Sequence, residues 1–542
     1  MVLTPICNHL QASKNDLQVC LIYPGNSFSG FSSLAISNIY STLNKIEGIC
    51  CDIGFINHTE SYFLEKPFNK FDILMFSITY EEHLLEVIKA LEEWGIPSER
   101  KKRNSNFPLI FGGGIGIYYN PAPFFPIFDV IYLGEGEERL EEAFSNLPGK
   151  DKQKIKEIFD SFDNILIPED YSFKYEKERV IEITGNRKRI FRSKEYPQRL
   201  SCSCFIVEET AFSNMGLIEI NRGCIEKCRF CVASAMGLPY REKSIEILKK
   251  EIESLSEHTN TIGLIGTAVT DYSKLDKLYE ILKGFNLKAS FASLKANTSS
   301  DIVFKIIAES NQKTVTIAPE TGSEIKRFAL NKKVKDETFF HFCEKAFEAG
   351  VENLKLYFLT GIPEESSEDI EKIAVLTNKF REIALKYWKA RKKTGKITVS
   401  VNPLIPKPFT PMQWYGMPKK SDIERRLRKI RTSILKIPNT NFNSENTKSA
   451  IFQAIISRGD ERIGKAAIKM VKEKISFRKA LREENLNMET LYTREREKDE
   501  LFPWDLVESG IKREYLRNEY EKIFKGKVSP KCFNGCKICG LC

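Results

Sequence analysis

The chain has 542 residues, of which 42% are hydrophobic and 29% are charged, and its formal net charge is +10. This length predicts two to four domains, and the composition is ordinary for a soluble globular protein. No basic start is followed by a long apolar core, so we expect no signal peptide. A long charge-free run, 107–128, contains four prolines and four glycines, which excludes a membrane helix, and we expect a strand, a turn and a loop there.

The fourteen cysteines are clustered, not scattered as a disulfide framework would be. Seven of them lie in two tight groups, 224–231 and 532–542. In a cytosolic protein such groups more often hold metal than form disulfides. We therefore expect a cytoplasmic protein with oxygen-sensitive metal clusters.

The first domain, 1–145, alternates short apolar runs with helical patterns. The runs predict buried strands, and 34–43 and 82–94 predict helices between them. The five expected strands are 17–23, 50–56, 73–79, 108–111 and 130–133. This alternation predicts an α/β fold with a parallel, doubly wound sheet of the flavodoxin-like type. Ligands of such sheets bind at the carboxyl ends of the strands.

The next segment, 146–214, is charged and irregular, with weak strand signals at 180–183 and 205–208. We expect a linker that packs between domains.

The stretch 221–234 reads NRGCIEKCRFCVAS and spaces Cys224, Cys228 and Cys231 as C-x3-C-x2-C. Three thiolates at this spacing can wrap one corner of an iron–sulfur cluster. Because such clusters normally take four thiolates, one iron stays open for a small molecule. Phe230 adds an apolar wall to the loop. The alternative is a structural zinc loop, which would need a fourth ligand such as Cys202 or Cys204.

In this motif the chain resembles the radical S-adenosylmethionine (SAM) superfamily. The resemblance implies a [4Fe–4S] cluster on the three cysteines, with the open iron chelated by the amino and carboxylate groups of SAM. It also implies reductive cleavage of SAM to a 5′-deoxyadenosyl radical, which abstracts hydrogen from a substrate. An electron donor such as flavodoxin or ferredoxin is the implied partner.

The region 215–416 continues the alternation of strands and helices. Its expected strands are 217–220, 261–265, 287–291, 314–318, 353–359 and 396–402. Six β-α repeats suit an open, partial (β/α)6 barrel of the TIM type, with reactive groups at the carboxyl face of the strands.

The resemblance assigns SAM contacts to the ends of these strands. Glu320 would accept hydrogen bonds from the ribose hydroxyls, or it would only favour a helix N-terminus by roughly 0.3–1 kcal/mol. The turn after the second strand departs from the family's usual G-G-E form. Lysine at a strand end can equally be solvated. The implied SAM-binding residues are Phe230, Gly266, Thr267, Ser293, Lys295, Glu320 and Tyr357.

Placed before such a core, the first domain resembles a cobalamin-binding domain, on the run FGGGIGIYYNPAPFFPIFDVIYLGEGEE at 111–138. Glycines there would let the backbone approach a bulky ligand closely. The usual D-x-H-x-x-G motif is absent, and the neighbours of His58 do not fit it. The alternative is a flavodoxin-like domain that binds nothing. The implied cobalamin contacts are Ser77, Thr79, Gly112, Gly113, Gly114, Gly134, Glu135 and Gly136.

Beyond the core, 417–525 reads as a helical domain, with helices at 421–436 and 450–474 and a loop at 438–447. The segments 379–396 and 419–436 are strongly basic and could face RNA. A buried stripe favours a solvated helix face instead. The stripe consists of Ile423, Leu427, Ile430 and Ile434.

The tail, 526–542, carries a second cysteine motif, C-x3-C-x2-C-x2-C. Its cysteines are Cys532, Cys536, Cys539 and Cys542, with Gly535 and Gly540 for tight turns. Four thiolates saturate either a second [4Fe–4S] cluster or zinc. A second cluster would relay electrons, whereas zinc would only pin the tail.

The sequence therefore predicts a radical SAM enzyme. Cobalamin dependence and C-methyl transfer form the leading hypothesis for its reaction. The alternatives are a radical rearrangement, cyclisation or sulfur insertion without methyl transfer. A non-catalytic iron–sulfur protein that binds RNA through basic helices is the alternative from a different class.

Overall fold

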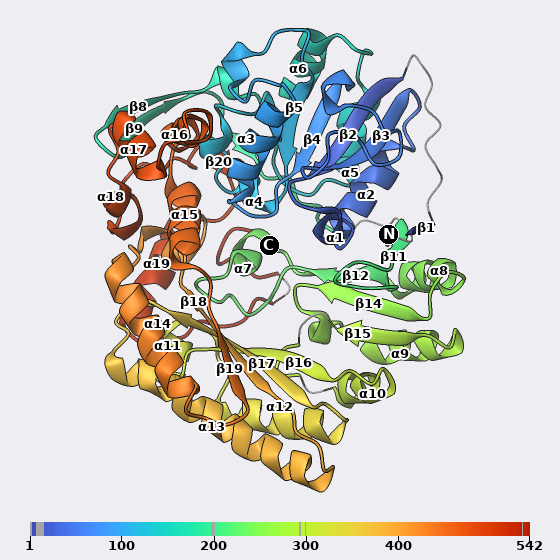
Figure 1. The fold of residues 1–542 in the computed structure, drawn as a ribbon, viewed down its shortest axis with the longest axis vertical. Helices are drawn as coiled ribbons and strands as arrows, with labels where there is room; N and C mark the ends of the chain where they lie inside the picture. Colours follow the sequence, from blue (N-terminus) through green and yellow to red (C-terminus); the bar gives the residue numbers. More distant parts are fainter. Residues whose placement is uncertain are drawn as a thin grey trace. The chain divides into compact units, whose positions relative to one another are not determined.

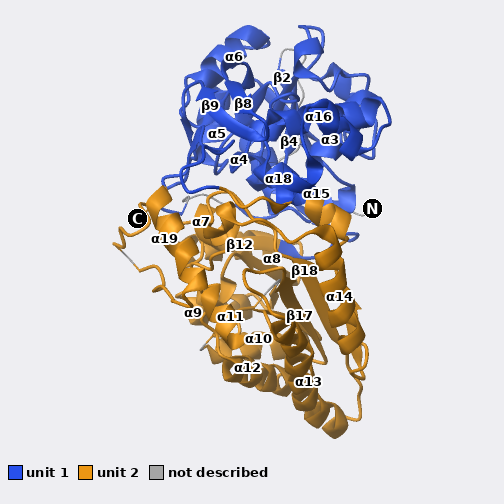
Figure 2. Ribbon diagram, turned by 90° about the vertical axis from the view of Figure 1, so that its left-hand side faces the viewer, with its two compact units in different colours: residues 1–216, 452–492, 497–510 blue, residues 217–451, 493–496, 511–542 orange. Residues whose placement is uncertain are grey.

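The computed structural model describes residues 3–6, 16–196, 201–291, 294–298, 300–533 and 535–541. They form two compact units (Figure 2). Unit 1 consists of 1–216, 452–492 and 497–510, and unit 2 of 217–451, 493–496 and 511–542. The region predicted as a separate helical domain, 417–525, is thus divided between the units. The predicted α/β class with parallel sheets is confirmed (Figure 1).

The sheet of unit 1 has six strands in the order β3-β2-β4-β5-β6-β7. All neighbours pair in parallel except β7, which is antiparallel to β6. Each parallel strand is a short apolar run, as expected of strands covered on both faces. The strands are β2 (Leu17–Tyr23), β3 (Ile49–Phe55), β4 (Ile73–Ser77), β5 (Leu109–Gly113), β6 (Val130–Tyr132) and β7 (Ile165–Leu166).

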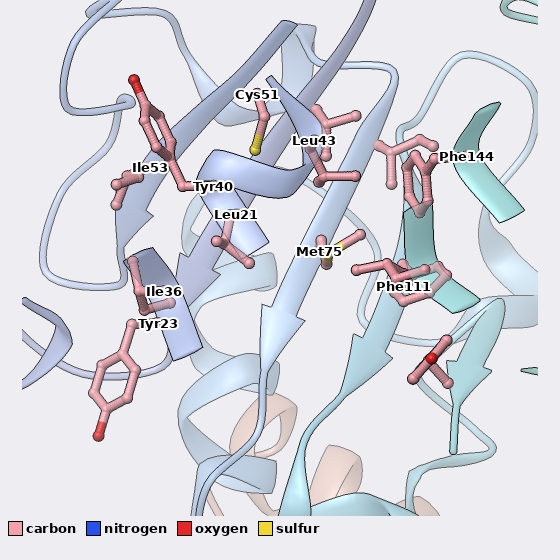
Figure 3. Packing of buried hydrophobic residues seen from close by; sticks show 14 of the residues in the cluster. Leu21, Tyr23, Ile36, Tyr40, Leu43, Cys51, Ile53, Met75, Phe111 and Phe144 are labelled. Atoms are coloured by element: carbon pink, nitrogen blue, oxygen red, sulfur yellow. The ribbon is translucent and has the colours of Figure 1, made fainter. Parts of the chain in front are cut away.

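A hydrophobic core lies on one side of this sheet. Side chains of β2, β3, β4 and β5 meet those of helix α2 (Leu34–Leu43), as Figure 3 shows. Burying each such side chain stabilises the fold by about 1.5–3 kcal/mol. The core members labelled in Figure 3 are Leu21, Tyr23, Ile36, Tyr40, Leu43, Cys51, Ile53, Met75, Phe111 and Phe144.

The segment predicted as a linker contributes regular elements to unit 1. It contains α6 (Lys152–Asp160), the edge strand β7 and the hairpin β8 (Ser172–Glu176)–β9 (Arg179–Thr184). The charged sequence concealed the helix, because only Ile155 and Phe159 of α6 are buried.

The helix predicted at 450–474 is broken into two. Helix α15 (Thr447–Arg458) ends before Gly459, and Asp460 caps α16 (Glu461–Lys472) by accepting a hydrogen bond from the Arg462 backbone N–H at 2.9 Å. A carboxylate in this position satisfies a free N–H at a helix start and so begins a new helix. Helix α16 packs on α3 (His83–Glu93) within unit 1.

Unit 2 contains two four-stranded sheets with the orders β13-β12-β14-β15 and β16-β17-β18-β19. The pairs β14–β15, β16–β17, β17–β18 and β18–β19 are parallel, and β13 is antiparallel to β12. The strands of the first sheet are β12 (Gly216–Arg222), β13 (Arg241–Glu242), β14 (Thr261–Gly266) and β15 (Lys288–Phe291). Those of the second are β16 (Thr314–Glu320), β17 (Asn353–Thr360), β18 (Ile397–Pro403) and β19 (Thr440–Asn443).

Strand β19 lies inside the region predicted as a loop, 438–447. Its sequence, TNFN, is polar, and none of its residues is buried, so no apolar pattern marks it. It is defined by its backbone pairing with β18.

Helices follow the strands of unit 2 along the chain, close to the predicted positions. Helices α8 and α9 pack together, as do α12 with α13 and α13 with α14. The predicted buried stripe of α14 is confirmed, so its basic residues form the opposite face. These helices are α8 (Ile245–Ser256), α9 (Leu275–Gly284), α10 (Asp301–Glu309), α11 (Glu324–Ala329), α12 (Asp336–Glu348), α13 (Ser367–Ala390), α14 (Lys420–Ile434) and α19 (Arg513–Phe524). Within the described residues, no helix is long and apolar enough to span a bilayer.

His83 begins α3 beside the carboxyl end of β4, and the sequence gave no reason to single it out. Its Nδ1 accepts a hydrogen bond from the Thr79 N–H at 3.3 Å, and its ring makes edge contacts with Tyr23 and Tyr80. Burial lowers the pKa of His83 from 6.5 to about 4, although nearby carboxylates act in the opposite direction.

The pKa of His83 is lower in the folded than in the unfolded state. Its neutral ring therefore favours folding above the unfolded pKa of 6.5, and this contribution to stability is lost as the pH falls towards about 4. At pH 5 we expect the wild type to have lost about 2 kcal/mol more than a His83→Gln variant, relative to pH 7. Urea unfolding of both proteins at the two pH values measures this difference. Equal losses would contradict it, and a histidine pKa near 4 in an NMR titration would support it directly.

Candidate functional site

The cysteine loop, 223–231, leaves the end of β12 through a glycine that no other residue can replace without strain. Gly223 has φ +81°, and a Cβ atom there would lie 2.4 Å from the Gly237 carbonyl oxygen. The loop ends at Cys231, which precedes the short helix α7 (Val232–Met236). The close approach of Gly223 and Gly237 therefore closes the loop on itself.

All three cysteines of this loop line one cavity of about 180 Å³ in unit 2. The cavity collects residues from the ends of β12, β14, β15 and β16, as the sequence predicted for a site at the carboxyl face of the strands. The predicted residues that line it are Cys224, Cys228, Phe230, Cys231, Thr267, Lys295 and Glu320.

Three predicted SAM residues have a different status. Ser293 lies outside the described residues. Gly266 and Tyr357 are not among the described residues that line this cavity. A Cβ atom on Gly266 would lie 2.4 Å from Oδ1 of Asn221, and the Tyr357 ring contacts the Lys355 ammonium at 5.0 Å from its centroid. Their proposed contacts with SAM stay predictions.

Glu226 lies inside the C-x3-C spacing and is the centre of an ion-pair network. Its carboxylate is 3.0 Å from Nζ of Lys295 and 2.7 Å from Nζ of Lys531. Lys295 also contacts Asp271 at 2.6 Å. Burial by itself raises the pKa of Glu226, but the two lysines outweigh it and bring the pKa to about 2. Lys295 is therefore held at the cavity wall by two carboxylates and is not freely solvated.

Glu320 faces the same cavity from the end of β16. Its backbone adopts φ +67°, a left-handed conformation that costs a non-glycine residue roughly 1–2 kcal/mol. Its carboxylate is 2.7 Å from Nζ of Lys332. Burial lowers the pKa of Lys332, but the Glu320 carboxylate, together with Cys228 and Cys231, outweighs this effect and the net pKa is raised. Such strain in a charged residue is typical of functional sites.

Sequence reasoning missed Glu226, Asp271 and Lys332. Glu226 was detectable as a charged residue between two of the cysteines predicted to hold a cluster. The pair Glu320–Lys332 joins residues on either side of α11, and no spacing rule indicates it.

Arg229 holds the cysteine loop from behind. Its fully buried guanidinium group donates hydrogen bonds to the Ala329 carbonyl at 2.6 Å and to Glu519 of α19 at 2.9 and 3.0 Å. Asn331 donates to the carbonyls of Glu226 and Lys227 at 3.2 and 3.1 Å. The loop backbone is thus fixed by side chains from distant parts of the chain.

The surroundings of the loop cysteines act on their thiols in opposite directions. Burial raises the pKa of Cys224 and Cys228, and the Lys295 and Lys332 ammonium groups oppose this shift at Cys224 and Cys228, respectively, without reversing it. Among the described residues, no three His, Cys, Asp or Glu side chains are arranged to hold a single metal ion.

The C-terminal cysteines lie against this loop, a proximity that the sequence did not indicate. Cys532, Cys536 and Cys539 are buried, and Cys542 lies outside the described residues. The Cys532 N–H donates to the Ile225 carbonyl at 2.7 Å, and Lys227 Nζ is 3.6 Å from Sγ of Cys536. Cys228 and Cys539 also line a common cavity of about 30 Å³. The two cysteine motifs are therefore neighbours within unit 2.

In unit 1 the glycines assigned to cobalamin have another explanation. Gly114 and Gly134 have φ +105° and +120°. Their Cβ atoms would lie 2.5 Å from the Ile78 carbonyl oxygen and 2.2 Å from the Phe191 carbonyl oxygen. A Cβ at Gly112 would meet the Phe128 ring at 2.8 Å. The protein's own atoms occupy the space that a side chain at these positions would need. These contacts explain the glycines without a bulky ligand.

The other assigned residues of unit 1 lie at the ends of β4, β5 and β6. Ser77 is the last residue of β4, Gly113 is the last of β5, and Thr79 bonds His83. The Glu135 N–H donates to the Phe191 carbonyl at 3.0 Å, and a Cβ at Gly136 would have no atom closer than 3.9 Å. Cys204, considered as a zinc ligand, is buried in the core of unit 1.

The buried Arg229–Glu519 pair predicts a large effect of a single substitution. Glu519→Gln would leave the guanidinium charge without a counter-charge, and we expect a loss of about 3 kcal/mol in the free energy of unfolding of unit 2. Glu521→Gln, on the same helix but half exposed, should cost less than about 0.5 kcal/mol. Denaturant titration of both variants compares them, and equal effects would contradict the role of the pair.

Two family models match the chain. Residues 35–168 match the model described as radical SAM proteins, N-terminal, and residues 218–377 match that of the radical SAM superfamily. The uncharacterized protein MJ0966 of Methanocaldococcus jannaschii is 30% identical over 456 residues, which cover 82% of this chain and 90% of that protein.

Solved structures with weaker similarity include the cobalamin-dependent S-adenosylmethionine radical enzyme OxsB. Its apo form has a TM-score of 0.43 at 16% identity, covering 70% of this chain and 56% of OxsB. Its form with aqua-cobalamin has a TM-score of 0.44 at 14% identity, covering 76% and 61%. Coproporphyrinogen III oxidase HemN from Escherichia coli has a TM-score of 0.31 at 12% identity, covering 41% and 52%. The chain spans less than two thirds of each structure, and at these scores neither protein assigns it a ligand or a reaction.

Proposed function

The chain belongs to the radical SAM superfamily, and we propose that unit 2 cleaves SAM at a [4Fe–4S] cluster held by Cys224, Cys228 and Cys231. The observation that supports this most strongly is the single cavity that these cysteines share with Lys295 and Glu320. When bound, the cluster supplies one electron, and SAM is divided into methionine and a 5′-deoxyadenosyl radical that takes a hydrogen atom from the substrate.

The charged residues of the cavity are proposed to bind and orient SAM. The Lys295 and Lys332 ammonium groups suit its carboxylate, and the Glu320 carboxylate suits its ribose hydroxyls. Their present ion pairs, at 3.0, 2.6 and 2.7 Å, hold these side chains in place before SAM binds. Such preorganisation reduces the entropy that binding costs.

The apolar residues of the cavity are proposed to exclude water from the reaction. Phe230, Leu294, Val334 and Phe339 line it beside the charged groups. Exclusion of water strengthens the charge interactions and protects a reactive radical from side reactions.

In the same proposal, the two sheets of unit 2 together form the open, partial (β/α)6 barrel. The protein is proposed to be cytoplasmic, where thiolates stay reduced.

Replacing one ligand tests the cluster assignment. After anaerobic reconstitution and reduction with dithionite, the wild type should form 5′-deoxyadenosine, and Cys228→Ala should lose this activity at least about a hundredfold. Cys343→Ala is the control, because Cys343 is a cysteine of the same unit that lies buried on α12, outside the cavity. Activity of the Cys228→Ala variant close to that of the control would overturn the assignment. Absence of 5′-deoxyadenosine from the wild type would favour the non-catalytic RNA-binding alternative.

Cobalamin on unit 1 and C-methyl transfer are a separate proposal. It is supported by the parallel sheet, since ligands of such sheets bind at the strand ends that carry Ser77 and Gly113. The glycines of these loops do not add support for cobalamin, because backbone carbonyls of the protein closely approach Gly114 and Gly134. Among the described residues of these loops, none is shown to fit cobalt.

Cobalt counting tests this second proposal. Reconstitution with hydroxocobalamin under reducing conditions should give one cobalt per chain, and turnover should release S-adenosylhomocysteine. The measurements are metal analysis after gel filtration and product chromatography. If 5′-deoxyadenosine forms while cobalt does not bind, methyl transfer by cobalamin is excluded, and a radical rearrangement, cyclisation or sulfur insertion takes its place.

The C-terminal motif is proposed to bind a second [4Fe–4S] cluster or zinc through Cys532, Cys536, Cys539 and Cys542. The support is the burial of the three described cysteines in contact with the cysteine loop. Iron and zinc analysis of the reconstituted protein distinguishes the two metals.

A further inference from the structure

We propose that the C-terminal segment, 524–541, forms the docking surface for a small acidic electron-carrier protein. The inference rests on the proposed function, because reductive cleavage of SAM needs one electron from outside the chain. One electron would leave the carrier, which is oxidised, and reduce the cluster proposed at Cys224, Cys228 and Cys231, and no covalent bond between the two proteins forms or breaks.

The charge of this segment is uniform. From Lys522 to the last residue the sequence has five lysines and no aspartate or glutamate. Lys527 and Lys537 are exposed, and within the described part of the chain neither forms an ion pair. The segment therefore presents positive charge that the protein's own carboxylates do not neutralise, and such a surface attracts an acidic partner over a Debye length of about 10 Å.

The same segment exposes large apolar side chains. Phe524, Val528, Phe533 and Ile538 are 43%, 49%, 58% and 49% exposed. They are four of the eleven exposed large hydrophobic residues in the described part of the chain, although the segment is short. Apolar side chains among cations are typical of a transient protein interface, with an apolar centre and a charged rim. This combination favours a protein over RNA as the partner.

The C-terminal segment lies against the cysteine loop, where the electron is needed. Cys532, Cys536 and Cys539 are buried, whereas Phe533, Lys537 and Ile538 of the same loop are exposed. On the inner side, Lys531 contacts Glu226 at 2.7 Å, and Cys539 shares a small cavity with Cys228. Only the thickness of this loop separates the exposed surface from the cysteine loop, so a carrier bound there would be placed for electron transfer to the cavity.

A charge-reversal variant tests the surface. Lys527→Glu combined with Lys537→Glu should weaken binding of an oxidised, acidic flavodoxin to the reconstituted protein at least about tenfold. The control combines Lys386→Glu and Lys389→Glu, two exposed lysines of α13 in the same unit, and should leave binding unchanged. Isothermal titration measures both dissociation constants, and circular dichroism checks that each variant is folded.

A second measurement uses the wild type alone. Its affinity for flavodoxin should fall about tenfold between 50 and 300 mM salt, because the attraction between opposite charges is screened. Equal affinities of the two double variants, or binding that does not depend on salt, would overturn the docking proposal. So would retention of a short RNA by the wild type without binding of flavodoxin. An assay for 5′-deoxyadenosine with dithionite as the reductant distinguishes failure of the docking proposal from failure of the proposed function. If the wild type forms no 5′-deoxyadenosine, the proposed function itself fails.

Discussion

Arg229 lies between two of the three cysteines of the cavity, and its guanidinium group is fully enclosed by protein. Its charge is balanced by Glu519, which is almost 300 residues away in sequence, and a buried pair of this kind tolerates no displacement of either partner. The cysteine loop is therefore fixed by α19, and α19 leads directly into the C-terminal cysteines. Loop, helix and tail form one connected structure, and the geometry of the cavity depends on it.

The cavity itself is lined by ions that are already paired. Lys295 is held by Glu226 and Asp271, and Lys332 by Glu320. A zwitterionic ligand such as SAM can exchange partners within such a network, whereas in an unpaired site each charge would first have to be desolvated alone. The left-handed backbone of Glu320 supports the same view, because the strain is retained where it directs a carboxylate into the cavity.

Unit 1 shows how one sequence pattern can have more than one physical explanation. Glycines follow the strands of its sheet, as they do in ligand-binding domains of this class. Their contacts explain them without a ligand, since backbone carbonyls of Ile78 and Phe191 approach where a Cβ would be. His83 had no sequence signal, because its ring contacts Tyr23 at the end of β2 and Tyr80 in the turn before α3, a combination that no local pattern encodes.

The sequence alone determined most strands and helices of the parallel sheets to within a few residues, because apolar runs and helical stripes are local. It did not indicate β19 or α6, in which few or no residues are buried. It also determined the cysteine loop, whose three cysteines lie within eight residues, and the strand ends that supply Thr267, Lys295 and Glu320. Only the tertiary structure decided that the two cysteine motifs are neighbours, that Glu226 pairs with Lys531, and that residues near 450–510 complete unit 1. These features join residues tens to hundreds of positions apart, and no local spacing encodes which of many lysines or carboxylates will meet.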